Sequence, residues 1–236
     1  MLLGLAAAAW SQTPAMPVTF HHLHLTGGSV HWISLYEELF DAKDIERVTL
    51  WGEQALRTGH VLLLVSPQTA PPAPQPSAIW HYGWGGVSLS ETYLAHNFSE
   101  VAWEPPLPAH QFHLHLESVT PNLAAAWYRD RLGAHVEFAS DVEHPADRDL
   151  RRPMALVRVG PVAMLIYRSD QPLASTRGKQ ADHLAFRVPD LSATLARFAA
   201  GDVTVLEPPH ALGSDRAAMV EGPDRVAIEL VEIKEP

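Results

Sequence analysis

Two short segments of the chain, FHLHL and DHLAF, carry a histidine at the same point of the same sequence pattern. His113 precedes Thr120 by seven residues, and His183 precedes Asp190 by seven. Thr120 and Asp190 each stand before apolar residues at helical spacing, which is the signature of a helix N-cap. The chain therefore predicts an internal repeat, in which a histidine-bearing strand leads into a capped helix.

Both copies continue with the same order of elements. In the first copy, the expected helix has Pro121 in its first turn, an apolar stripe of Leu123, Trp127 and Leu132, and Gly133 at its end. In the second copy, the expected helix has an apolar stripe of Leu191, Leu195 and Phe198, and Gly201 at its end. The strands expected after them cover 135–138, 155–159 and 162–167 in the first copy and 203–206, 216–220 and 226–232 in the second. Proline early in a helix and glycine after it fit their usual positions. Each copy is therefore predicted to be a βαβββ unit.

The last strands of the two copies differ at one informative position. When they are superposed, Leu165 of the first copy falls on Glu229 of the second. Two imidazoles and one carboxylate suit a borderline divalent cation and leave coordination positions open. His113, His183 and Glu229 are therefore the candidate metal ligands. The alternative is that both histidines are half-buried strand residues that bond to backbone, and that Glu229 is a surface carboxylate on an edge strand.

The pattern resembles the vicinal oxygen chelate superfamily, which includes glyoxalase I, extradiol dioxygenases, fosfomycin-resistance proteins and bleomycin-binding proteins. The segments that carry the resemblance are His113 with WYRDRLG (127–133), HLAFRVPD (183–190) and EGPDRVAIEL (221–230). The resemblance implies an α+β fold of paired βαβββ modules that form cup-shaped mixed sheets, the glyoxalase/bleomycin resistance/dihydroxybiphenyl dioxygenase fold. It also implies His113, His183 and Glu229 as metal ligands. Glyoxalase I-like members tend to use a fourth protein ligand, and Leu165 stands where that carboxylate is expected.

The N-terminal half looks like a shortened version of the same architecture. The segment FHHLHL (20–25) and the apolar positions of 32–39 repeat the strand–helix opening, and 48–51 and 60–65 supply later strands. A further opening at 79–84 is followed by a helix-like run at 89–97 and then by prolines. The expected organisation is a signal or tail segment at 1–16, a degenerate half at 17–108 with modules at 17–66 and 78–104, and a complete two-module domain at 109–236.

The histidines of the N-terminal half have two interpretations. His22 and His81 could retain a second metal site with help from Glu100 or Glu104. Because the strand that would carry their carboxylate is missing, a structural role is preferred, in which this half braces the sheet or a dimer. An uncovered sheet edge would otherwise favour aggregation.

Five further residues are candidates for catalysis or substrate binding. His115 is two residues from His113 and is expected on the same face of the strand, as Ala227 and Val231 are beside Glu229. His115 is therefore a candidate acid or base, with simple packing as the alternative. The remaining candidates are Tyr167, Arg177 and Arg216, which could hold a substrate oxyanion, and His210, expected on a loop after a strand.

Composition limits the classes of partner. The formal net charge is −10, and no basic stripe of the kind that binds a phosphate backbone is present. The chain has no cysteine, so any metal must be held by nitrogen and oxygen. The expected partner is a small molecule, with no nucleic acid and no membrane in the mature form, and a homodimer is compatible with the sequence.

The first twelve residues resemble the apolar part and small-residue cleavage site of a secretory signal, although no Lys or Arg precedes Lys43. Export to the periplasm is therefore favoured over a cytoplasmic location.

The sequence thus predicts a divalent-metal-dependent enzyme whose substrate chelates the metal through neighbouring oxygens. Fe(II) is favoured, with Mn or Zn as alternatives. Dioxygenase-like oxidoreductase chemistry and lyase- or isomerase-like proton transfer stay open. The competing class is a metal-free sequestering protein of the bleomycin-resistance type, and a third is a structural role in oligomer assembly.

Overall fold

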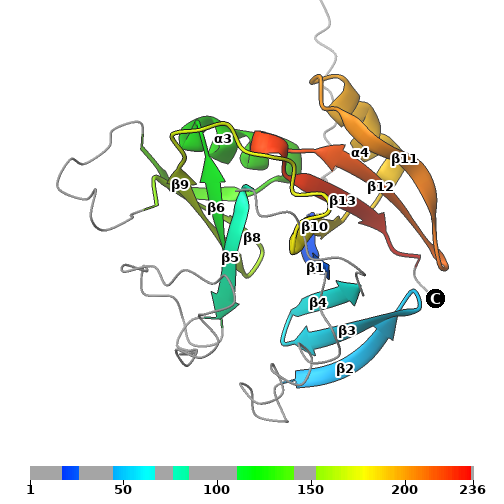
Figure 1. Cartoon of the computed structure of the whole chain (residues 1–236). Helices are drawn as coiled ribbons and strands as arrows, with labels where there is room; N and C mark the ends of the chain where they lie inside the picture. The colour runs from blue at the N-terminus through cyan, green and yellow to red at the C-terminus, as the bar shows by residue number, and fades with distance from the viewer. Residues whose placement is uncertain (1–17, 27–44, 67–76, 85–110, 141–152, 235–236) are drawn as a thin grey trace, which may run out of the picture.

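The computed structural model describes residues 18–26, 45–66, 77–84, 111–140 and 153–234. These residues form two β-sheets and two α-helices (Figure 1). The predicted α+β class is confirmed. No helix in these ranges is long and apolar enough to cross a membrane. The predicted signal segment, the predicted helices near 32–39 and 89–97, Glu100 and Glu104 lie outside the described residues.

The larger sheet combines strands from both ends of the chain. Its order is β11-β12-β13-β10-β1-β4-β3-β2. The strands are β1 (Thr19–Thr26), β2 (Ile45–Leu50), β3 (Glu53–Thr58), β4 (Val61–Ser66), β10 (Ala181–Arg187), β11 (Val205–Leu212), β12 (Asp215–Glu221) and β13 (Ala227–Glu232). In Figure 1, β1 and β10 lie side by side at the centre of this sheet.

The smaller sheet has the order β5-β6-β9-β8-β7. Its strands are β5 (Ile79–Trp84), β6 (Phe112–Ser118), β7 (His135–Ala139), β8 (Ala155–Val159) and β9 (Val162–Arg168). The strands of both predicted repeats are thus confirmed, although β11 ends at Leu212 rather than at the predicted residue 206. Strand β3 was not predicted.

The two described helices follow strands β6 and β10, which carry His113 and His183. Helix α3 (Pro121–Leu132) starts with proline and ends at Gly133, which adopts the left-handed conformation with φ 70°. Helix α4 (Leu191–Ala199) starts at Asp190, whose side chain accepts a hydrogen bond from the backbone N–H of Ala193. The cap at Thr120 differs, because its side chain makes no capping hydrogen bond.

The apolar stripe of α3 departs from the prediction at Leu123, which is 62% exposed. Leu132 is buried and Trp127 packs against the core, as predicted. Ala124, Ala125 and Tyr128 complete the buried face. The buried face is therefore rotated toward small residues, which let the helix lie close to β7 and β8.

The two C-terminal repeats do not share one sheet. β10 of the second repeat pairs with β1 in antiparallel fashion, and β6 of the first repeat pairs with β5. Both repeats within 109–236 have the predicted βαβββ order. Each repeat is in addition extended by strands of the N-terminal half.

Each sheet has one face in a common apolar core. Leu23 of β1, Leu184 of β10 and Leu114 of β6 are all buried in it, and the rings of Phe20 and Phe112 join the sheets at a centroid distance of 5.8 Å. Side chains alternate between faces along a strand. The histidines next to these leucines are therefore directed to the opposite faces of their sheets.

Candidate metal centre

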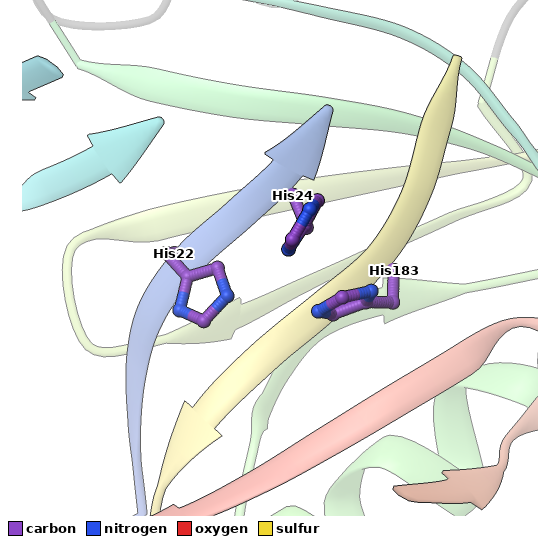
Figure 2. Close-up of side chains that lie close together, drawn as sticks. All are labelled: His22, His24 and His183. Carbon is purple, nitrogen blue, oxygen red and sulfur yellow. The ribbon is translucent and has the colours of Figure 1, made fainter. Parts of the chain in front are cut away.

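Four donor side chains converge on the larger sheet and are here called cluster I: His22, His24, His183 and Glu229. The first two come from β1, and His183 and Glu229 come from β10 and β13, the next two strands of the sheet. In the register, His24 faces His183 across β1 and β10, and Glu229 faces Ala185 across β10 and β13. Figure 2 shows the three imidazoles close together over these two adjacent strands.

The geometry of cluster I brings nitrogen and carboxylate atoms to coordinating range. Ring nitrogens of the three histidines lie within 4.8 Å of one another. Oε2 of Glu229 is 3.5 Å from Nε2 of His22 and 3.8 Å from Nε2 of His183. Within the described residues, neither Nε2 has a hydrogen-bond partner. Buried polar atoms are normally satisfied, so this arrangement suits a ligand that accepts nitrogen and oxygen donors.

Two β-bulges shape the strands of cluster I. The register between β1 and β10 shifts between Phe20 and His22, and again between His24 and Leu25. The first shift leaves His21 as an extra residue on β1, and the second leaves Asp182 as an extra residue on β10. A bulge redirects a side chain that would otherwise alternate. The side chain of each extra residue therefore contacts the histidine that follows it in the sequence.

Those redirected side chains hold the Nδ1 atoms of two cluster I histidines. Nδ1 of His21 lies 2.8 Å from Nδ1 of His22, and the His21 ring stacks on Trp51 at 5.6 Å. Oδ1 of Asp182 lies 2.7 Å from Nδ1 of His183. With Nδ1 occupied, Nε2 is the nitrogen that both histidines present to Glu229.

The third imidazole occupies the edge of the cluster. Nε2 of His24 lies 2.8 Å from Oγ of Ser66 and 3.9 Å from Oε2 of Glu53. Its ring centroid is 4.4 Å from that of His183. His24 is therefore adjacent to His22, His183 and Glu229 but already has a hydroxyl partner.

Burial decides the charge of most of these imidazoles. It lowers the pKa of His22 well below 6.5, and the neighbouring histidines lower it further. It lowers the pKa of His24 to about 3, with His183 contributing in the same direction. Burial also opposes protonation of His183, but Asp182 and Glu229 outweigh it and raise that pKa. His22 and His24 are therefore neutral donors at neutral pH.

A second group of histidines, here called cluster II, lies on the smaller sheet: His81 of β5 with His113 and His115 of β6. Their ring nitrogens also lie within 4.8 Å of one another, and all three residues are buried. The ring centroids of His81 and His115 are 4.7 Å apart, and those of His113 and His115 are 5.0 Å apart. Burial lowers the pKa of His115 to about 2, and the neighbouring histidines add to this.

The two clusters are related position by position. His22 faces Ala185 and His24 faces His183 in the larger sheet, while His81 faces His115 and Gly83 faces His113 in the smaller one. The third imidazole is therefore contributed by opposite strands in the two clusters. Glu229 lies across from Ala185, and Leu165 lies across from His115. The carboxylate of cluster I thus has no counterpart in cluster II.

The predicted ligand set is corrected in one member. His183 and Glu229 lie together, but His113 belongs to the other sheet, in cluster II. The reason is the strand pairing, since β10 is joined to β1 rather than to β6. His22 takes the position predicted for His113. By the same register, Leu64 on β4 is the local counterpart of Glu229, because it faces His24 on β1.

The predicted catalytic residues fall on both sheets. His115 lies beside His113, as strand alternation predicted, and the ring of Tyr167 is 5.2 Å from that of His115. His115 is therefore part of cluster II, and Tyr167 lies beside that cluster rather than beside Glu229. Arg177 does approach cluster I, because its Nε lies 3.6 Å from Oδ1 of Asp182, while its Nη1 lies 2.7 Å from Oε1 of Glu207.

Two of the predicted substrate-binding residues are placed differently from the expectation. Arg216 faces Glu232 in the β12–β13 register, where Met219 faces Glu229. An odd spacing from Met219 directs Arg216 to the opposite face, and its Nη1 bonds to Oε2 of Glu232 at 3.2 Å. His210 lies within strand β11 rather than on a loop, and it is exposed.

Three side chains in or beside cluster I were not predicted there from the sequence. His22 was considered only for a separate weak site, and His24 and Asp182 were not considered. A signal for His22 was present in FHHLHL, which repeats the pattern of FHLHL. Asp182 gave no signal, because only the bulge turns it toward His183.

Comparison with known proteins agrees with this architecture. The model of the Glyoxalase/Bleomycin resistance protein/Dioxygenase superfamily matches residues 110–230, a little over half of the chain. The chain therefore belongs to this superfamily, as the resemblance had indicated. A comparison with curated proteins gave no match.

Solved structures of glyoxalase I from Zea mays share the fold over most of the chain. A mutant form gives a TM-score of 0.65 at 13% identity, with 91% of this chain and 92% of that chain covered. Another structure of the same protein gives 0.60 at 15% identity, with 91% and 92% covered. A fosfomycin resistance protein from Listeria monocytogenes gives 0.42 at 16% identity, with 52% and 90% covered.

Proposed function

We propose that cluster I binds one divalent cation through His22, His183 and Glu229, and that the chain is a metal-dependent enzyme for a small molecule with neighbouring oxygens. The observation that carries the proposal is the position of Glu229. Its Oε2 lies within 4 Å of the Nε2 atoms of two buried histidines, and neither nitrogen has a hydrogen-bond partner among the described residues.

The donor chemistry fits such a cation. Neutral imidazole and carboxylate together suit Fe(II), Mn or Zn, and three protein ligands leave positions for a chelating substrate. Fe(II) is the first candidate, followed by Mn and Zn. When bound, the cation supplies Lewis acidity toward oxygens on which negative charge develops.

The residues around the ligands prepare the site. The Asp182 carboxylate fixes the tautomer and orientation of His183, and His21 fixes the orientation of His22. On the other side of Glu229, the same face carries the small or apolar residues Ala185, Ala217 and Val231. These three side chains carry no atom that could coordinate the cation, so the orientation of a substrate would be set by the metal ligands. Apolar contact with the three side chains would exclude water from the bound substrate.

One positive charge on this face suits an anionic substrate. Arg187 faces Val231 in the β10–β13 register, two residues from the position that faces Glu229. Its charge is near enough to His21 to lower the pKa of that imidazole, in addition to the larger effect of burial. We therefore include a carboxylate or phosphonate beside the chelating oxygens in the proposed substrate class.

The test is metal content and affinity in matched variants. Glu229→Gln and His183→Ala are compared with Glu232→Gln, which changes a carboxylate of the same strand that bonds to Arg216. We expect the first two to lose at least tenfold in affinity for Mn²⁺, and Glu232→Gln to bind as the unmodified chain does. Equal affinity in all four proteins would refute the ligand assignment.

The enzymatic part needs a separate measurement. The metal-loaded protein is assayed with α-hydroxycarbonyl compounds, catechols and vicinal-oxygen phosphonates, with and without dioxygen. Turnover that disappears in Glu229→Gln supports an enzyme, and oxygen consumption separates dioxygenase from lyase or isomerase chemistry. Tight binding of such compounds to metal-free protein, without turnover, would instead favour the sequestering class.

A further inference from the structure

Cluster II is as buried as cluster I and has a different donor set. His81, His113 and His115 bring three ring nitrogens within 4.8 Å of one another. They are held by two adjacent antiparallel strands, with His81 directly facing His115. Their positions are therefore fixed by the backbone of the sheet rather than by mobile loops.

A glycine keeps space open between two of these imidazoles. A Cβ atom at Gly83 would lie 3.3 Å from Nε2 of His113 and 3.4 Å from Nε2 of His81. The two Nε2 atoms are therefore directed at the same small volume above Gly83. The equivalent position in cluster I is occupied by His24, so the open volume is particular to cluster II.

The surroundings of cluster II contain apolar side chains where cluster I has its acid. Leu165 faces His115 and belongs to an apolar group with Leu156, Ala163 and Tyr167. The ring of Trp80 packs on His115 at 5.2 Å. A cation bound here would meet nitrogen donors from the three histidines and no carboxylate from the position of Leu165.

We propose that cluster II is a second metal site, independent of cluster I, in which His81, His113 and His115 bind Zn²⁺ or Cu²⁺ through three imidazoles. Imidazole suits Zn and Cu, whereas Mn and Mg favour carboxylate, carbonyl and water oxygens. Three histidines are also a known ligand set of zinc sites with an open position. Cluster I, with Glu229, accepts Mn²⁺ as well, so the two sites differ in selectivity.

The experiment is a titration of the metal-free full chain against a chromophoric chelator, which registers only sites that compete with it. We expect two equivalents of Zn²⁺ and one of Mn²⁺. His115→Leu should remove one equivalent of Zn²⁺ and leave Mn²⁺ binding unchanged. His183→Ala should remove the Mn²⁺ site and leave one equivalent of Zn²⁺.

A second variant distinguishes the loss of the metal site from misfolding of the chain. Gly83→Ala retains all three imidazoles but places a methyl group in the volume between His81 and His113, and we expect it to weaken the second Zn²⁺ equivalent at least tenfold. Circular dichroism and thermal melting establish that each variant is folded. The proposal would be overturned if His115→Leu and Gly83→Ala both bind as many equivalents of Zn²⁺, as tightly, as the unmodified chain does. Failure of cluster I alone would appear as loss of the Mn²⁺ site with the cluster II equivalent intact.

Discussion

Oδ1 of Asp182 lies 2.7 Å from Nδ1 of His183, although the two residues are neighbours on one strand. The contact exists because Asp182 is the extra residue of a bulge, which cancels the usual alternation. Burial alone would raise the pKa of Asp182, but the hydrogen bond with His183 and further contacts lower it overall. The carboxylate is therefore an ionised acceptor that orients His183.

Asp182→Asn should weaken cation binding at cluster I by about 10–100-fold, the usual cost of losing such a partner of a ligating histidine. Chelator competition with Mn²⁺ measures this change. Asp190→Asn is the control, because asparagine still caps α4 and the residue lies outside the cluster. An Asp182→Asn protein with unchanged affinity would contradict the orienting role.

The two helix caps should respond differently to truncation. Asp190→Ala removes the hydrogen bond to the N–H of Ala193 and should lower the free energy of unfolding by about 1 kcal/mol. Thr120→Ala removes no capping hydrogen bond and should change it by less than about 0.5 kcal/mol. Urea unfolding of the two variants checks the contrast, and equal losses would argue against it.

Two leucines of α3 separate its buried face from its exposed face. Leu132 is buried in the common core, so Leu132→Ala should cost about 2–5 kcal/mol of unfolding free energy. Leu123 is 62% exposed, so Leu123→Ala should stay within about 0.5 kcal/mol. The same denaturant series measures both. A large loss in Leu123→Ala would restore the helix orientation that the sequence had suggested.

Acid should destabilise the metal-free protein below pH 6.5. The pKa values of His24 and His115 are lowered to about 3 and about 2, so between these values and 6.5 the unfolded chain binds protons that the folded chain excludes. Each histidine should cost about 1.4 kcal/mol at one pH unit below 6.5. His183 has the opposite sign, because its pKa is raised. Its contribution is complete below 6.5 and is lost as the pH rises through the raised value.

Urea unfolding between pH 5 and 8 measures this dependence above the range where most carboxylates titrate. The variant His115→Leu removes one of the histidines whose pKa is lowered and should therefore lose less stability below pH 6.5. A slope that is the same in both proteins would show that His115 does not exclude protons in the folded state.

Local patterns in the sequence predicted the elements of both repeats, since caps, periodicity and glycine positions act within a few residues. Strand alternation also placed His115 beside His113, and superposition of the repeats placed Glu229 close to His183. The first inference needed only the alternation of side chains along a strand, and the second needed only the superposition of the two repeats.

Strand partners could not be predicted in the same way, because pairing depends on contacts between distant segments. Adjacent repeats suggested that His113 and His183 share a site, but β10 pairs with β1 and β6 pairs with β5. The error in Arg216 has a similar origin, since its face depends on the register of β12 with β13. The role of Asp182 depends on a bulge that no local motif announces.

The position of β10 between β1 and β13 also sets the order of events during synthesis. His22 is synthesised before His183 and Glu229, so the donors of cluster I cannot meet until the ribosome has synthesised the chain between them. Metal capture at cluster I therefore waits for the synthesis of β13, whereas all three cluster II donors have been synthesised once β6 has emerged.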